Sequence, residues 1–251
     1  MSSLTVQRPG PYGGFPAVPQ VKSTQVQDPF GLRETYRNNP DIIDILDKID
    51  EALANFNPKE NRYLDLHETD FRPLSNLKVA NGELLNLETL LMILSQKSQY
   101  PFDRANLSKA NLSEATLIKA DLYRINLSKA TLIKTNFYGA NLDEANLEEV
   151  HSEGADFSGA SLNRARLYGA HLEGAHLNGT HLSEVNLSGA HLNGAYLYGT
   201  HLGATLYGTD LRGADLRRAF ASVDFKELTG KALKKHLVKH FHVVINDETK
   251  F

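Results

Sequence analysis

The chain has 251 residues, of which 41% are hydrophobic, and a formal net charge of −3. This composition predicts a soluble domain of ordinary size, and the charge is neither basic enough to indicate direct nucleic-acid binding nor acidic enough to indicate disorder. Because the sequence contains no cysteine, it excludes a disulfide framework, thiolate catalysis and a cysteine-based zinc site.

The beginning of the chain carries no targeting signal that we recognise. MSSLTVQRPG lacks a basic segment followed by an apolar run, and no stretch approaches about eighteen consecutive apolar residues. We therefore expect a cytoplasmic protein with no membrane partner. Residues 1–38 are rich in proline and glycine, a composition that cannot form a core, so they are expected to be a flexible arm.

Residues 39–100 are expected to form a helical capping region. Asn39 and Pro40 open a helix as N-cap and first helical residue. The apolar stripe of this helix is Ile42, Leu46, Ile49, Leu53 and Phe56. A second helix is expected over about Glu83–Gln96. Between the two helices, LDLHETDFRP (64–73) reads as two repeat units centred on Leu66 and Phe71.

Residues 101–222 repeat every five residues, as in ANLSK, ANLSE and ATLIK, with a leucine or phenylalanine at the centre of each unit and a small residue two places before it. On a helix, steps of five would rotate the leucines by about 140° each, so no apolar face would form. In a straight strand, successive units would point to opposite faces. The period therefore predicts a short extended segment followed by a corner, repeated so that the chain winds into a tube.

Units such as ADLYR, ANLDE and ADFSG resemble the pentapeptide-repeat family, whose pattern is a small residue, Asn or Asp, Leu or Phe, and two variable positions. The resemblance implies an all-β solenoid: a right-handed quadrilateral parallel β-helix of about six coils. Helices are expected to cap both ends, because an open coil end would expose unpaired backbone and leucine side chains. The sequence itself leaves the number of sides open. Two sets recur at twenty residues: Phe137 and Phe157, and His151, His171 and His191. Four tyrosines recur instead at multiples of fifteen, as a three-sided tube would also explain: Tyr123, Tyr138, Tyr168 and Tyr198.

Three departures from the pattern carry expectations. Ser152 stands at a leucine position, so either a hydroxyl points into the core or the backbone bulges. The centres step by only four from Leu202 to Leu206, which predicts one shortened corner. The residue two after the centre is mostly charged before Gly139 and mostly glycine afterwards, so we expect the turn type to change near the middle of the tube.

Histidines recur at the outward position before the centre. They are His151, His171, His176, His181, His191 and His201. In coils of twenty residues, His151, His171 and His191 form one column with rings about 4.8 Å apart. We interpret this column as a stacked ladder, since no carboxylate or cysteine stands at ligand spacing. A metal-binding column is the alternative, and mutual repulsion of charged rings near about pH 6 is a further hypothesis.

Residues 223–251 are expected to form a basic amphipathic helix over about Thr229–Phe241, with Leu233, Leu237 and Phe241 on one face, followed by a tail. The helix is interpreted as a cap for the open end of the tube or as a homodimer contact. The final FHVVI segment (241–245) is a candidate additional strand.

No nucleotide-binding loop, zinc-protease motif or nucleophile elbow occurs, so neither catalysis nor a cofactor is expected. We predict a non-enzymatic scaffold that binds another protein. The candidate partner-binding residues are an acidic run without lysine or arginine: Asp143, Glu144, Glu148, Glu149, Glu153 and Asp156. Because the resemblance includes family members proposed to imitate DNA at gyrase, a gyrase-directed DNA mimic is the second hypothesis, and the metal-binding histidine column is the third.

Overall fold

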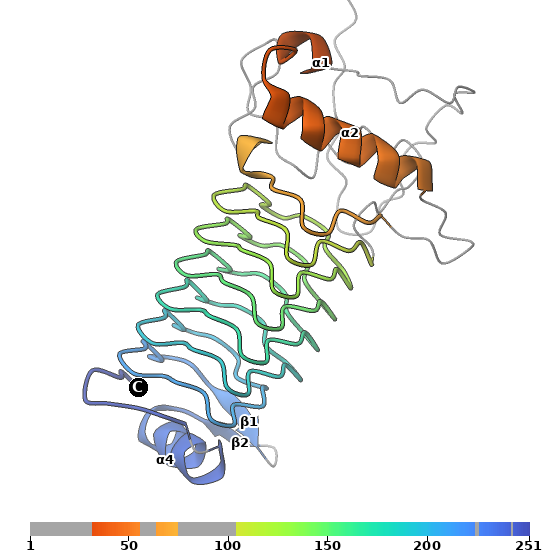
Figure 1. The fold of residues 1–251 in the computed structure, drawn as a ribbon. Coiled ribbons are helices and arrows are strands. Elements are labelled where there is room, and N and C mark those ends of the chain that lie inside the picture. The colour runs from red at the N-terminus through yellow and green to blue at the C-terminus, as the bar shows by residue number, and fades with distance from the viewer. Residues whose placement is uncertain (1–31, 56–63, 75–103, 224–225, 242) are drawn as a thin grey trace, which may run out of the picture.

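The computed structural model describes residues 32–55, 64–74, 104–223, 226–241 and 243–251. Most of this chain forms coils stacked along one axis, with α1 (Leu32–Thr35) and α2 (Pro40–Asn55) at the N-terminal end of the stack and α4 (Gly230–Phe241) across the C-terminal end (Figure 1). The remaining elements are the 3-10 helix η2 (Arg72–Leu74) and the strands β1 (Ala221–Val223) and β2 (Lys226–Leu228). None of the helices in these ranges is long and apolar enough to cross a bilayer.

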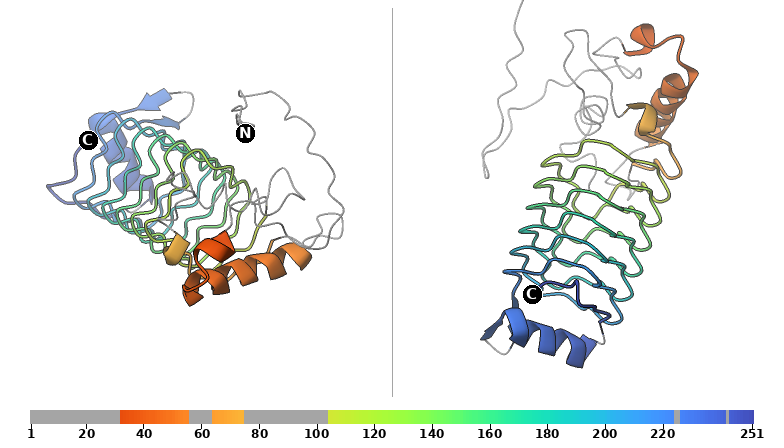
Figure 2. Two further views of the ribbon diagram at one scale, coloured as in Figure 1. Left: turned by 90° about the horizontal axis from the view of Figure 1, so that it is seen from above. Right: turned by 90° about the vertical axis from the view of Figure 1, so that its left-hand side faces the viewer.

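The coils are joined by parallel bridges between residues twenty apart, from Asn106 and Asn126 to His181 and His201. Each bridge is a pair of backbone hydrogen bonds. The amide of Leu107, for example, donates to the carbonyl of Asn126 (2.8 Å). Four bridged positions occur in every twenty residues, so each coil holds four pentapeptides, and the three-sided alternative does not apply. The coils lie in parallel along the axis in a second view (Figure 2).

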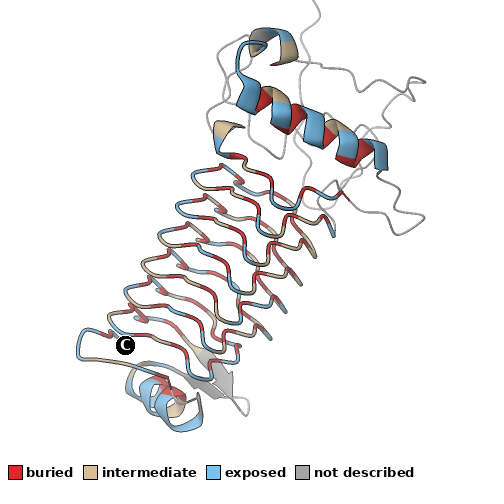
Figure 3. Cartoon of the chain, viewed as in Figure 1, coloured by how far each residue is buried: buried red, intermediate tan, exposed pale blue. Residues whose placement is uncertain are grey.

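The interior of the rod is apolar and filled. The leucine or phenylalanine of each unit and the small residue two places before it are buried, whereas the residue between them faces outward, so buried and exposed positions alternate around every coil (Figure 3). Phe137 and Phe157 stack with ring centroids 5.0 Å apart. The prediction that leucines five apart share one dry axis is confirmed.

Several buried hydroxyl groups inside the rod donate hydrogen bonds to backbone carbonyls. Ser152 is fully buried, and its Oγ donates to the carbonyl of His171 in the next coil (2.9 Å). The first of the two expectations for Ser152, an inward hydroxyl, is therefore the observed one. Threonines at small-residue positions act similarly, as Thr200 does when its Oγ1 donates to the carbonyl of Leu177 (2.6 Å). These bonds offset the cost of burying a polar atom.

The expected change of turn type is wrong. The residue two after each centre has a positive φ at every regular corner, whether it is charged, as in Lys109 (58°), or glycine, as in Gly159 (65°). Turns of both kinds close with the same bond, from the small residue's amide to the carbonyl of the preceding centre, as in Ala110 to Leu107 (3.1 Å) and Ala160 to Phe157 (2.9 Å). Coil stacking therefore imposes one type II geometry, and a side chain there carries a strain of about 1–2 kcal/mol rather than changing the turn.

The shortened corner lies where the four-residue step predicted it. Bridges between the two coils on either side of this corner join residues nineteen apart, as in Asn186 and Thr205. Gly203 lies at the shortened corner, and its carbonyl accepts from the amide of Glu184 (2.7 Å). A Cβ at this position would lie 3.1 Å from the Cα of Ser183, so the close approach of two coils accounts for the glycine.

At the N-terminal end, Asn39 caps α2 through its Oδ1, which accepts from the amide of Ile42 (3.3 Å). The predicted stripe of α2 is buried at its four described positions, together with Ile45 and Ala52, and Phe56 lies outside the described residues. The predicted helix over 83–96 also lies outside them.

The predicted arm over residues 1–38 extends too far, because α1 lies within it. Leu32 of α1 is buried, and Arg33 contacts Asp47 and Asp50 of α2 at 2.6 Å each. The predicted end of the arm at residue 38 rested on proline and glycine content alone. The buried side chain of Leu32 and the two ion pairs of Arg33 hold α1 against α2.

The two early repeat units pair with the first regular units of the rod. Asp65 bridges Asn106, and Asp70 bridges Asn111, although 41 residues separate each pair in the chain. The amide of Leu66 donates to the carbonyl of Asn106 (2.8 Å), and that of Phe71 donates to Asn111 (2.7 Å). Leu66 and Phe71 are both buried, as repeat centres should be.

At the C-terminal end, β1 and β2 form an antiparallel hairpin, and α4 follows at Gly230 with Leu233 and Leu237 buried. The tail then returns to the rod. Val244 bridges Asp210, and Lys250 bridges Asp215 in parallel. The FHVVI segment thus contributes a bridge to the stack, and the tail belongs to the rod rather than extending from it.

Asp215 in this last part of the rod carries a pH-dependent prediction. The side chain of Arg217 donates from Nε to Oδ1 (2.9 Å) and from Nη2 to Oδ2 (2.7 Å), and these bonds lower the pKa of Asp215 below its ordinary value. Because the pKa is lower in the folded state, the carboxylate stabilises the fold above about pH 4, and this contribution is lost as the pH falls through the folded-state pKa.

We expect Asp215→Asn to lower the free energy of unfolding by about 1 kcal/mol at pH 7. The difference from wild type should shrink steadily below about pH 4. Urea denaturation at neutral and acid pH measures it. A difference that stays constant into the acid range would mean that the charge of Asp215 contributes nothing.

Candidate functional site

Four columns of outward residues run along the rod, one on each side, and we name the sides by these columns. The first side carries Asn106, Asn126, Asn146, Arg166, Asn186 and Thr205, and the second carries Asn111, Thr131, His151, His171, His191 and Asp210. The third side carries Thr116, Asn136, Asp156, His176, Tyr196 and Asp215, and the fourth carries Asp121, Asn141, Ser161, His181, His201 and Phe220. The two residues following each centre form the turn, and we count the first of them with the side of its centre.

The predicted acidic run does not gather on one side. Its fourteen positions span most of a twenty-residue coil, so the acids encircle the rod. Asp143 lies on the fourth side, Glu148 on the first, Glu153 on the second and Asp156 on the third. The six acids are close together in the chain, but none of them are twenty residues apart, so no two of them occupy equivalent positions in successive coils.

Most of these acids contact a neighbouring coil. Glu144 pairs with Arg124 (2.8 Å), Glu148 with Arg166 (3.5 Å) and Glu149 with Lys129 (3.5 Å). Asp143 accepts from the hydroxyl of Ser161 (2.6 Å). The bonds from Arg124 and Tyr123 to Glu144 lower the pKa of Glu144. Stacking thus places three of the six acids, Glu144, Glu148 and Glu149, beside basic side chains of a neighbouring coil.

The third side carries the largest group of exposed apolar side chains on the regular coils. Ile118, Tyr138 and Tyr198 occupy one column after the centres, and Tyr196 lies next to it. Ile118 and Tyr198 are each 40% exposed, Tyr138 is 49% exposed and Tyr196 is 47% exposed. Sequence reasoning did not select this group, because the tyrosine spacing of fifteen pointed to a three-sided tube, whereas a twenty-residue coil aligns Tyr138 with Tyr198.

Two tyrosines of the third side, Tyr196 and Tyr198, contact side chains of neighbouring coils. The ring of Tyr196 stacks on that of His176 with centroids 4.8 Å apart. Arg218 lies over the ring of Tyr198, with its guanidinium carbon 5.4 Å from the centroid. Such contacts restrict the side-chain rotamers, so the third side is a fixed surface before any partner arrives.

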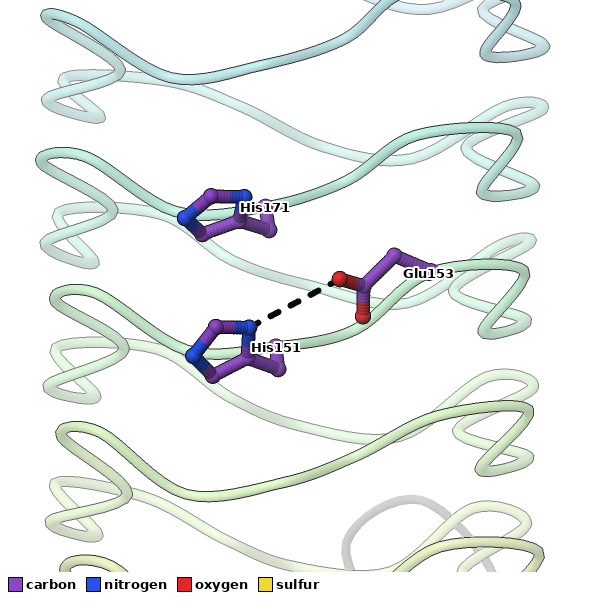
Figure 4. Close-up of side chains that lie close together, drawn as sticks. All are labelled: His151, Glu153 and His171. Atoms are coloured by element: carbon purple, nitrogen blue, oxygen red, sulfur yellow. Dashed lines mark ion pairs between the residues drawn. The ribbon is translucent and has the colours of Figure 1, made fainter.

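The second side carries the histidine column, and the predicted stacking is confirmed. The ring centroids of His151 and His171, and of His171 and His191, lie 4.8 Å apart, with interplanar angles of 15° and 5°. The premise that no carboxylate stands at ligand spacing is wrong. Glu153 lies two residues after His151 on the same side, and its Oε1 is 3.6 Å from Nδ1 of His151 (Figure 4).

The same arrangement recurs one coil later, where Oε1 of Glu173 lies 3.5 Å from Nδ1 of His171. Side-chain atoms of His151, Glu153 and His171 all lie within 4.8 Å of one another. The sequence signal for this cluster is a histidine followed two places later by glutamate (HSE and HLE), repeated at twenty residues.

Comparison with known proteins finds a family match for the coiled part of the chain. A model described as pentapeptide repeats matches eight copies within residues 102–132, 135–174, 165–203 and 180–220. No curated protein matches the sequence.

Several solved structures are similar to the chain. One is HetL, a pentapeptide repeat protein involved in heterocyst differentiation regulation from the cyanobacterium Nostoc sp. strain PCC 7120, with 29% identity, 51% of this chain and 70% of that chain covered, and a TM-score of 0.30. Another is QnrB1, a plasmid-mediated fluoroquinolone resistance protein, with 20% identity, coverage of 49% and 68%, and a TM-score of 0.32. A pentapeptide repeat protein from the Arabidopsis thaliana thylakoid lumen has 25% identity, coverage of 61% and 88%, and a TM-score of 0.22.

Proposed function

Because residues 102–220 of this chain belong to the pentapeptide-repeat family, whose fold is a right-handed β-helix, we propose that the protein is a non-enzymatic scaffold that binds another protein along the third side of its rod. The observation that carries the proposal is the alignment of Ile118, Tyr138, Tyr196 and Tyr198 on one side. Tyrosine is enriched at protein interfaces because it combines a large apolar ring with a hydroxyl that can remain hydrated.

The rigidity of the rod supports this function. Bridges between successive coils hold the backbone of every side, and Tyr196 and Tyr198 each contact a ring or a guanidinium beside them. A partner that docks here has little ordering cost to overcome, so a modest contact area can yield useful affinity.

A non-enzymatic role is supported by the contents of the rod. Within the described ranges, the interior is filled by buried side chains, and its hydroxyl groups, such as those of Ser152 and Thr200, donate to backbone carbonyls. A nucleophilic hydroxyl needs a base within hydrogen-bond reach, and these two donate to carbonyls instead.

We also propose that the helices cap the rod. Leu233 and Leu237 of α4 are buried, and α2 buries its whole apolar stripe over the described positions. An open coil end would expose unpaired backbone and leucine side chains. The leucines of α4 are buried within the molecule, so they are not available to a second copy of the chain. Val238 is the large apolar residue of α4 that is exposed (44%), and one such residue is a weak basis for a homodimer contact.

The gyrase-directed DNA mimic has less support. A DNA mimic needs a continuous run of negative charge along one surface. The six acids instead encircle one coil, and Glu144, Glu148 and Glu149 contact basic side chains. They remain a proposed contact set for a protein partner, and the experiment below includes them.

The test is affinity capture from the native host with the full-length protein, followed by quantitative mass spectrometry. In the test variant Tyr138, Tyr196 and Tyr198 are changed to serine. In the matched control Tyr168→Ser and Tyr207→Ser remove two exposed tyrosines of the first side (54% and 59% exposed). In a third variant the six acids are changed to their amides.

We expect one protein to be retained equally by wild type and by the first-side control, and at least about tenfold less by the third-side variant, because interface tyrosines often contribute more than 1 kcal/mol each. Retention that depends on the acids and not on the tyrosines would move the proposed contact to the acidic ring. A supercoiling assay with purified DNA gyrase checks the DNA mimic, and we expect no change in supercoiling.

A further inference from the structure

The histidine column on the second side has a feature that a ladder of stacked rings does not require. Glu153 and Glu173 follow His151 and His171 by two residues, and the two glutamates are aligned in adjacent coils. The amide of Gly154, next to Glu153, donates to the carbonyl of Glu173 at 3.0 Å, so the backbones at this point are one coil spacing apart. The two glutamates therefore start from backbone positions about 4.8 Å apart along the axis and carry the same charge.

One oxygen of each carboxylate has no hydrogen-bond donor. Within the described part of the chain, Oε2 of Glu153 and Oε2 of Glu173 are both buried atoms without a hydrogen-bond partner. The other oxygens lie 3.6 Å and 3.5 Å from the Nδ1 atoms of His151 and His171, too far for good hydrogen bonds. Buried carboxylate oxygens are normally satisfied, and a cation is one way to satisfy two aligned carboxylates at once.

The geometry supplies ligand atoms of more than one type. In Figure 4 the carboxylate of Glu153 lies between the levels of the two imidazoles and beside them. Side-chain atoms of His151, Glu153 and His171 lie within 4.8 Å of one another. Donors of tetrahedral zinc are roughly 3.4 Å apart, from Zn–N and Zn–O distances of about 2.0–2.1 Å. The three side chains, 51%, 36% and 37% exposed, can rotate to close the difference.

We propose that His151, Glu153 and His171 bind a divalent transition metal ion, with Zn²⁺ as the representative ion. Imidazole and carboxylate ligands without sulfur suit ions such as Zn²⁺, Co²⁺ and Ni²⁺. The site joins two successive coils. A bound ion would neutralise the carboxylate of Glu153 and could take its unpartnered Oε2 as a ligand.

The neighbouring histidine pair His181 and His201 provides a matched control. These residues also bridge adjacent coils, on the fourth side, but the residues two places later are Ser183 and Gly203. Two histidines at bridged positions of adjacent coils, without a carboxylate two places later, are thus available in the same rod. A second arrangement, His236 and His240 on α4, has ring centroids 4.7 Å apart and must be removed to make the titration specific.

The experiment titrates ZnCl₂ by calorimetry into full-length protein that carries no affinity tag. All proteins contain His236→Asn and His240→Asn, and the unchanged double variant is the reference. We expect the reference to bind one zinc ion per chain. Glu153→Gln and His171→Asn should each raise the dissociation constant at least about tenfold, because the loss even of a group that only hydrogen-bonds to a metal ligand typically costs about 10–100-fold in affinity. His181→Asn should leave the dissociation constant unchanged. Circular dichroism establishes that each variant retains the fold of the reference.

Co²⁺ provides a second readout, since its visible absorption reports the ligand geometry and is expected to be lost in Glu153→Gln. The proposal is overturned by titration curves that are the same for reference, Glu153→Gln and His171→Asn. It is also overturned if His181→Asn weakens binding as much as His171→Asn does, or if the reference protein binds no zinc.

Discussion

Replacing Phe157 with alanine is expected to lower the free energy of unfolding by about 3–5 kcal/mol, the range typical of a buried phenylalanine. Phe157 is fully buried and stacks on Phe137 in the preceding coil, with centroids 5.0 Å apart and nearly parallel rings. The coils above and below are held by backbone bonds, so they cannot collapse into the space that the ring leaves. A cavity would therefore remain on the axis.

Equilibrium urea denaturation followed by circular dichroism measures the loss, with Tyr138→Ala as the control. Tyr138 belongs to the coil of Phe137 but is 49% exposed, so its truncation should change stability by less than about 0.5 kcal/mol. Nearly equal losses for the two variants would show that the centre residues do not form the core. Because each coil contacts only its neighbours, hydrogen exchange should show the loosening to be greatest in the coils that contain Phe137 and Phe157.

Gly203→Ala is the second prediction, with an expected loss of about 1–3 kcal/mol from overpacking. The new Cβ would lie 3.1 Å from the Cα of Ser183 and 3.6 Å from the carbonyl oxygen of Leu182. Both neighbours are backbone atoms of the adjacent coil, so they can move only if the coil spacing changes. Any side chain at the shortened corner is therefore expected to lower the free energy of unfolding.

The control is Gly159→Ala, at a regular corner with φ +65° and no atom within 4 Å of the added Cβ. Its cost is conformational, about 1 kcal/mol. Asparagine tolerates the left-handed region, so Gly159→Asn should recover part of that loss, whereas Gly203→Asn should be no better than Gly203→Ala. Thermal and urea denaturation of the four variants give the comparison. Recovery by asparagine at both positions would mean that backbone conformation, and not the close approach, accounts for Gly203.

The candidate sites show where sequence reasoning reached its limit. The six acids are close in the chain, and that closeness suggested a patch, but the coil distributes them over all four sides. Conversely, Tyr138 and Tyr198 are sixty residues apart and occupy one column. The glutamates beside the histidine column were visible as a repeated His-x-Glu pattern, yet their relation to His171 depends on which coils are neighbours.

The five-residue pattern by itself determined the inward residues, the presence of a corner in each unit and the shortened corner near Gly203. The N-cap residue Asn39 and the apolar stripe that follows it determined α2. Each of these features follows from side-chain polarity and local backbone preference. The tertiary structure decided the rest. Stacking at twenty residues per coil set four sides, imposed the same positive φ on lysine and glycine corners, returned the tail to the rod at Val244 and brought His151, Glu153 and His171 together. These features depend on contacts between residues distant in the chain, and a period of five is compatible with more than one way of stacking the coils.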